Sequence, residues 1–135
     1  DTRNISHRYR EFVSILVMSL ITKRFARNEP PHNAQSISEE CQIPIQLAQR
    51  TLYELQEISL IHEVASDEKG EEIAYQPSMD INQLNVAVLL DRLDTHGSED
   101  FKIDKDQTYS DEWAVLMKAK EEYYKSAGNV LLKDL

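Results

Sequence analysis

The apolar residues of the first 27 positions predict one long helix. Ser6 is suited to cap a helix of about residues 7–27, and Asn28-Glu29-Pro30-Pro31 ends it, because proline lacks an amide donor and restricts the residue before it. The apolar side chains recur at helical spacing: Tyr9, Phe12, Val13, Leu16, Val17, Leu20, Ile21 and Phe25. This face is wider than one small core requires, which indicates deep burial or a partner.

Two helices are predicted after a short extended segment of residues 32–35. Ser36-Ile37-Ser38-Glu39 matches a capping box, so a short helix ending at about Cys41 is expected. After a turn at Gln42-Ile43, Pro44 fits the first position of a further helix that ends at about Ile58. The buried stripe of that helix is Ile45, Ala48, Leu52 and Leu55, and its solvent side carries Gln46, Gln49, Arg50, Tyr53 and Gln56.

A β-hairpin and two more helices follow. Leu60–Ala65 and Glu72–Gln76 alternate as paired strands around a turn at residues 67–70. Asp80-Ile81-Asn82-Gln83 resembles a capping box that opens a helix ending at Gly97. Residues 98–109 are polar and acidic, as in a linker, and Ser110 is suited to cap a last helix that ends near Ala127.

This order of elements predicts a mostly α chain with a small β-hairpin, an α+β fold of the winged helix-turn-helix type with an added C-terminal helix. We expect residues 1–97 to form the winged-helix domain and residues 98–135 to form an acidic linker, a helix and a tail that pack on it. Gln42 and Ser59 stand where winged-helix sequences favour glycine, so both are expected to be left-handed at a cost of about 1 kcal/mol each.

Charge decides how this scaffold is interpreted. Gln46, Gln49, Arg50 and Tyr53 are the residue types that bind base edges in the major groove. Phosphate contacts need Lys and Arg, however, and residues 29–80 hold two such residues against eleven Asp and Glu. The sequence therefore predicts that nucleic acid is an unlikely partner.

The first helix is basic and has two interpretations. Its cations are a solvated face, or Arg3, Arg8 and Arg10 lie close to a membrane that precedes them. The sequence starts at Asp1 without a methionine or a signal peptide, which we interpret as a piece of a longer protein.

Several segments together resemble a known family. These are "SHRYREFVSILVMSLITKRF", "PP", "IPIQLAQRTLYELQEISLI", "AYQPSMDINQLNV", "LDTHGS" and "NVLLKDL". They are similar to the C-terminal domain of some bacterial YihY/BrkB inner-membrane proteins, which are often labelled ribonuclease BN. The resemblance implies a missing membrane-embedded N-terminal part and a place on the cytoplasmic side of the inner membrane.

Catalytic or metal chemistry is not expected. The four histidines are scattered, Cys41 is the one cysteine, and the three glycines form no phosphate loop. Residues 104–115 lack the glycine and the glutamate that a calcium loop requires. The sequence thus predicts no enzyme, no cofactor and no catalytic or metal residue.

Two functions remain open. The first is a non-catalytic interaction or regulatory module of the membrane protein, with Trp113, Met117 and Tyr124 as a surface for a protein partner or for a second copy in a homodimer. The alternative is a dimeric winged-helix transcriptional regulator that places two copies of the helix after Pro44 in successive major grooves.

Overall fold

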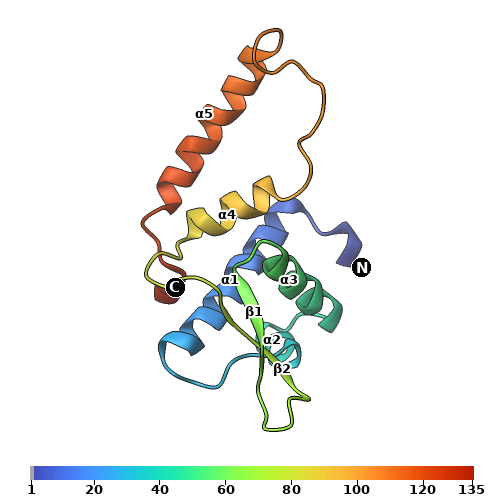
Figure 1. The fold of residues 1–135 in the computed structure, drawn as a ribbon, viewed down its shortest axis with the longest axis vertical. Helices are drawn as coiled ribbons and strands as arrows, with labels where there is room; N and C mark the ends of the chain where they lie inside the picture. Colours follow the sequence, from blue (N-terminus) through green and yellow to red (C-terminus); the bar gives the residue numbers. More distant parts are fainter. Residues whose placement is uncertain (1) are drawn as a thin grey trace.

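The computed structural model describes residues 2–135, which form five α-helices, two short 3-10 helices and one two-stranded sheet (Figure 1). The helices are η1 (Thr2–Asn4), α1 (His7–Ala26), α2 (Ala34–Cys41), α3 (Ile45–Glu57), α4 (Val86–Thr95), α5 (Ser110–Ala127) and η2 (Leu132–Asp134). The strands are β1 (Ile61–Ala65) and β2 (Ile73–Pro77). The predicted α+β fold with a helix-turn-helix and a hairpin is confirmed.

The core of the winged-helix body, residues 2–97, is built around α1. Val17 and Met18 are fully buried against side chains from α3, α4 and the hairpin. The same cluster contains Val13, Ile21, Ile37, Leu47, Ala48, Leu52, Leu55, Ile58, Leu60, Ile61, Leu84, Val86, Leu89, Leu90 and Leu132. On the outer side of α1, Tyr9 and Phe12 are half exposed, with ring centroids 5.7 Å apart. Part of the wide apolar face is thus left uncovered.

The second helix begins three residues before the predicted start, because Asn33 and not Ser36 caps it. Asn33 Oδ1 accepts a hydrogen bond from the Ser36 amide at 2.8 Å, and Ser36 Oγ accepts one from the Asn33 amide at 3.0 Å. Ser36 therefore takes the place that glutamate usually has in a capping box, where the side chain bonds the backbone amide of the cap residue. His32 lies just before the cap, and its carbonyl accepts a hydrogen bond from the Tyr75 amide at 2.9 Å. Of the extended segment expected at residues 32–35, only the beginning thus lies beside the hairpin.

The backbone confirms the two expected left-handed positions. Gln42 ends α2 with a φ of 55°, and Ser59 precedes β1 with a φ of 61°. Asn28, which was not expected there, has a φ of 54° after α1. In this left-handed conformation the Cβ atom of each residue lies close to the carbonyl oxygen that follows it, which costs about 1 kcal/mol. Glycine has no Cβ and avoids this cost.

The hairpin and α4 differ from the predictions only at their ends. β1 and β2 pair antiparallel from Ile61 opposite Pro77 to Ala65 opposite Ile73. The helix predicted from Asp80 begins at Val86, because Asn85 Oδ1 accepts a hydrogen bond from the Val88 amide at 2.8 Å and caps it. Residues 80–83 form a turn instead, since the Asp80 side chain bonds the Asn82 amide at 2.9 Å.

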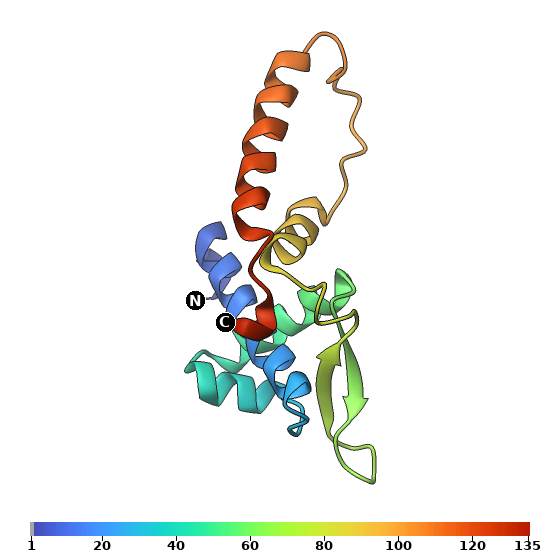
Figure 2. The ribbon, with the colours of Figure 1, turned by 90° about the vertical axis from the view of Figure 1, so that its left-hand side faces the viewer.

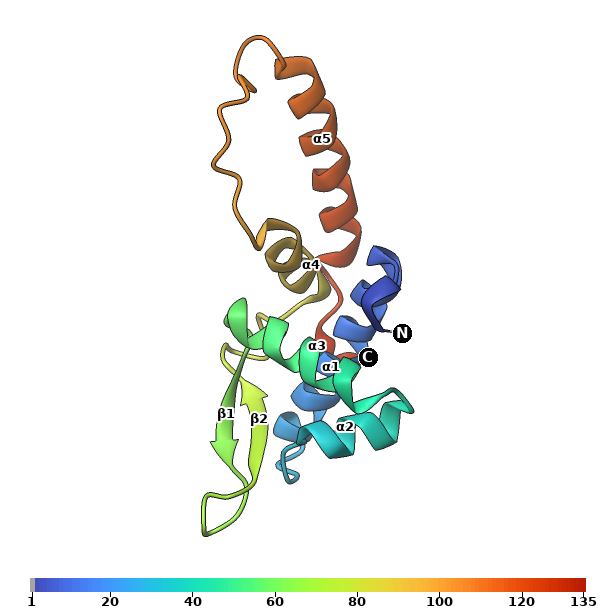
Figure 3. The same cartoon turned by 90° about the vertical axis from the view of Figure 1, so that its right-hand side faces the viewer.

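The loop and helix after α4 form an arm, residues 98–127, that extends from the body at the end opposite the hairpin (Figures 1 and 3). None of the α5 side chains is fully buried. Ser110 is the first helical residue, and no side chain bonds the helix start. Among the residues described, no helix combines the length and the apolar content needed to cross a bilayer.

After the arm, the chain returns to the body and completes its core (Figure 2). Leu131 forms a β-bridge with Asn85, and the Leu132 amide donates to the Leu84 carbonyl at 3.1 Å. The Leu132 side chain is completely buried beside α1. The last residues therefore belong to the folded body and not to a loose tail.

Candidate nucleic-acid interface

The four residues singled out on the third helix lie on one outward face of α3. Gln46 and Gln49 are exposed, Tyr53 is 63% exposed, and Arg50 is half-buried between them. Their spacing places them on neighbouring turns, while Leu47, Thr51 and Leu55 fill the opposite, buried face. The helix thus presents two amides, one guanidinium and one phenol side by side.

Acidic neighbours engage two of these four side chains. Arg50 Nε lies 3.5 Å from Glu54 Oε1, one turn further along α3. A hydrogen bond with Glu57 raises the pKa of the Tyr53 hydroxyl, and the charge of Glu57 acts in the same direction. Contact with DNA through Arg50 or Tyr53 therefore competes with these internal contacts.

The wing turn between β1 and β2 is acidic. Asp67 Oδ1 accepts hydrogen bonds from the amides of Glu71 and Glu72, at 2.9 and 3.2 Å, which fixes the turn with several carboxylates on it. The Glu72 side chain accepts a hydrogen bond from Asn33 Nδ2 at the start of α2. Lys69 is the one cation of this turn. The wing therefore offers a phosphate backbone little attraction.

Polar contacts hold the second half of α5 on the body. Asp94 Oδ2 accepts hydrogen bonds from Lys120 Nζ at 2.8 Å and from the Tyr124 hydroxyl. Burial raises the pKa of Asp94, but these two hydrogen bonds and the charges of Lys120 and His7 together leave that pKa below its ordinary value. Tyr123 donates to Glu11 Oε2 at 2.9 Å, and burial together with this bond raises the pKa of Tyr123 to about 12.

The first half of α5 extends past α4 and exposes apolar side chains. Leu116 is 46% exposed and Met117 is 40% exposed. Trp113 is half-buried. Lys105 Nζ lies 4.5 Å from the centroid of its ring, and the loop lines a cavity of about 280 Å³ beside it. Of the three residues predicted for association, Tyr124 is therefore used inside the chain, whereas Trp113 and Met117 lie where a partner can reach them.

The three arginines predicted to lie near a membrane fall in different surroundings. Arg3 and Arg8 are exposed at the start of the chain. Arg10 is half-buried, and its Nε has no hydrogen-bond partner among the described residues. It lines a cavity of about 210 Å³ together with His7, Glu11 and His96. The three residues do not form one basic patch.

Comparison with solved structures shows which class of protein has this fold. IscR of T. potens superposes with a TM-score of 0.66 at 15% sequence identity, over 99% of this chain and 88% of that one. CymR of Staphylococcus aureus gives 0.61 at 15% identity, over 93% of each chain. CymR (YrzC), the global cysteine regulator of B. subtilis, gives 0.63 at 11% identity, over 97% and 94%. No protein-family model and no curated protein matches the chain.

These likenesses establish a winged-helix fold shared with transcriptional regulators from η1 to η2. They also correct three expectations. The function as a module of a YihY/BrkB membrane protein, the place at the inner membrane and the exclusion of nucleic acid are contradicted, because the matching chains include a global cysteine regulator and a chain described as a "putative DNA binding protein".

The sequence did not reveal how α1, α4 and α5 meet. His7 and Glu11 are one helical turn apart, but Asp94, Lys120 and Tyr123 join them only in the folded chain. The spacing of His7 and Glu11 is the one local signal for this cluster, and such pairs are common on exposed helices.

Proposed function

We propose that this chain is a dimeric, DNA-binding transcriptional regulator of the winged-helix class, which contacts the major groove with α3. One observation carries the proposal. The outward face of α3 gathers Gln46, Gln49, Arg50 and Tyr53 on a scaffold that matches DNA-binding regulators over more than nine-tenths of its length. Glutamine and arginine bind adenine and guanine edges in pairs of hydrogen bonds, so this face supplies direct base contacts.

The uncovered apolar surface supports a dimer. Trp113, Leu116 and Tyr123 lie on one stripe of α5, which continues beyond the end of α4. Tyr9 and Phe12 extend the uncovered surface onto α1. A second copy that covers the same stripe buries both surfaces in a symmetric contact. We assign DNA contact to residues 1–97 and association to residues 98–135, with no catalytic step in either.

The acidic wing determines what kind of DNA binding is expected. The segment that holds α3 and the hairpin has two cations, Arg50 and Lys69. Because Arg50 is assigned to a base edge, a dimer neutralises about two phosphates through Lys69, which gives a slope of log K against log salt of about −2. Base contacts must therefore contribute most of the affinity, and binding to unrelated DNA is expected to be weak.

Selection from a random duplex library with the purified chain tests the proposal. We expect an inverted repeat with half-sites one helical turn apart, bound well below micromolar concentration. Arg50→Ala should weaken that complex by about 1 to 3 kcal/mol and relax the preference at one base position. Lys102→Ala is the matched control and should change nothing, because Lys102 is exposed and belongs to the loop after α4, which lies at the end opposite the hairpin (Figure 1). A library without enrichment, or equal losses in both variants, would overturn the proposal.

A further inference from the structure

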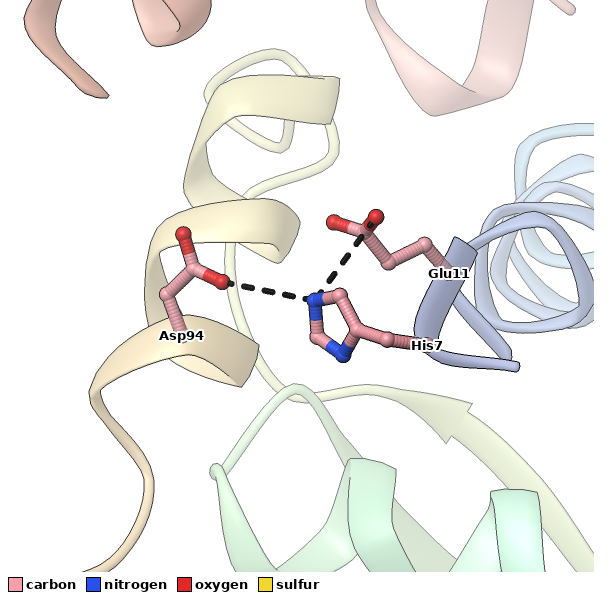
Figure 4. A group of neighbouring side chains, drawn as sticks. All are labelled: His7, Glu11 and Asp94. Carbon is pink, nitrogen blue, oxygen red and sulfur yellow. Dashed lines mark ion pairs between the residues drawn. The ribbon is translucent and has the colours of Figure 1, made fainter. Parts of the chain in front are cut away.

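Three metal-ligand side chains converge where α1 passes the end of α4 (Figure 4). His7 and Glu11 lie one turn apart on α1, and Asp94 faces them from α4. His7 Nε2 is 3.8 Å from Glu11 Oε1 and 3.8 Å from Asp94 Oδ1, and the three ligand atoms all lie within 4.8 Å of one another. We infer that this cluster binds a divalent metal ion and that its donor set fits Zn²⁺.

The spacing is close to that of a metal site. Donor atoms on one tetrahedral zinc ion lie about 3.3 Å apart, because each bond to nitrogen or oxygen is about 2.0 Å long. The three atoms must therefore approach one another by about 0.5 to 1.5 Å. His7 is well placed to make this change, because its side chain is 60% exposed, whereas Asp94 is 11% exposed and is held by Lys120 and Tyr124.

Contacts from α5 orient the two carboxylates toward His7. Tyr123 donates to Glu11 Oε2, and Lys120 and Tyr124 donate to Asp94 Oδ2. The second oxygen of each carboxylate, Oε1 and Oδ1, is the one that faces His7 Nε2 in Figure 4. Metal-ligating carboxylates are commonly held by such outer hydrogen bonds, which fix the direction of the ligand oxygen. An ion pair with histidine alone does not require this arrangement.

Charge and space also suit a cation. With a neutral histidine, the two carboxylates outweigh the ammonium of Lys120 by one negative charge. The adjoining cavity of about 210 Å³, lined by His7 and Glu11, leaves room for water as a fourth ligand. One imidazole nitrogen and two carboxylate oxygens without a thiolate favour zinc over ions that prefer sulfur. Arg10 lines the same cavity, so we expect micromolar binding and not nanomolar binding.

A bound ion would join α1 to α4 directly beneath α5. The side chains that hold the carboxylates belong to the arm, so the ion would also strengthen the attachment of the arm to the body. This site goes beyond the proposed function, because base contacts by α3 do not require it. Metal binding is measured without DNA, so failure of one proposal leaves the other standing.

Calorimetric titration of the purified chain with ZnCl₂ near neutral pH tests the site. We expect one ion per chain, and a rise in the thermal unfolding midpoint with ZnCl₂ that a chelator reverses. His7→Ala should remove both effects, because it deletes one of three ligands while breaking only two long ion pairs. Tyr123→Phe should weaken binding by about tenfold through the orientation of Glu11.

His62→Ala is the matched control, since His62 is an exposed histidine on β1 away from the cluster. It should bind zinc as the unaltered chain does. Titration without saturable heat, or zinc binding by His7→Ala within twofold of the unaltered chain, would overturn the inference. Loss of binding in His62→Ala would do the same, because it would move the site elsewhere.

Discussion

The winged-helix body and the arm are both helical, yet different forces hold them. In the body, apolar side chains of α1, α3, α4 and the hairpin cover one another, and each fully buried one contributes about 1.5 to 3 kcal/mol. In the arm, α5 buries no side chain completely and is attached by a few charged and hydroxyl groups together with the partly buried Tyr124 and Ala127. Partly exposed contacts of this kind contribute about 1 kcal/mol or less each. Apolar burial thus holds the body together, whereas the arm has a surface that a second copy can cover.

The largest expected effect tests where the body ends. Leu132→Ala should lower the free energy of unfolding by about 3 kcal/mol, because Leu132 is fully buried although it follows the arm in sequence. Leu135→Ala, at an exposed leucine three residues later, should change it by less than about 0.5 kcal/mol. Chemical denaturation measures both. Equal small effects would place the whole C-terminal segment outside the core.

The second prediction concerns the arm alone. Leu116→Glu should weaken self-association by at least about tenfold, or about 1.4 kcal/mol, because it places a charge on the uncovered stripe of α5. The free energy of unfolding of the body should be nearly unchanged, since Leu116 is not part of its core. Sedimentation over a range of concentrations measures the association, with Lys118→Gln as the control on the same helix. A dimer that tolerates Leu116→Glu would mean that another surface pairs the chains.

The third prediction concerns backbone strain inside the body. Ser59→Gly should stabilise the chain by up to about 1 kcal/mol, because Ser59 has a φ of 61° and glycine adopts this conformation without steric cost. Ser66→Gly, at a serine of the hairpin without a positive φ, should give no gain. Denaturation midpoints measure both variants. If both variants change the denaturation midpoint equally, the left-handed conformation of Ser59 carries no strain.

The smallest effect is a pH dependence of the body. Burial lowers the pKa of His32 below its ordinary value of 6.5, and Arg24 adds to this, while Glu40 and Glu29 oppose it. The unfolded chain therefore takes up a proton first. The stability that His32 contributes is complete above about pH 6.5 and is lost as the pH falls below that value.

Unfolding at about pH 7.5 and at about pH 5.5 measures this loss. His32→Gln keeps a polar side chain that can bond Ser36 Oγ, as His32 Nδ1 does at 2.9 Å, but it cannot titrate. Its stability should depend less on pH than that of the unaltered chain. If the stability of both proteins changes equally with pH, the pH dependence belongs to other groups.

The sequence predicted the body well because its signals are local. Helical spacing in α1, Pro44 before α3 and the apolar alternation of the hairpin each lie within a few residues, and the structure follows them. Helix starts were wrong where two nearby residues can each cap a helix, as Asn33 and Ser36 can before α2 and Asp80 and Asn85 before α4.

Features that depend on distant residues could not be predicted in the same way. Nothing near Leu132 indicates that it pairs with Leu84, and nothing near His7 indicates Asp94. The exclusion of nucleic acid was wrong for a related reason. Net charge was treated as if it excluded a partner, although the base contacts proposed for α3 depend on only a few residues.

The acidic wing turn has a consequence for how the proposed regulator finds its site. Proteins that slide along DNA remain bound between sites through sequence-independent attraction to phosphates. Asp67, Glu68, Glu71 and Glu72 oppose that attraction in the hairpin, whose strand β1 contacts α3. Such a protein leaves unrelated DNA quickly and searches mainly by repeated collisions from solution. The fraction of its sites that is occupied would then follow the concentration of free protein closely, because few molecules stay bound to unrelated DNA.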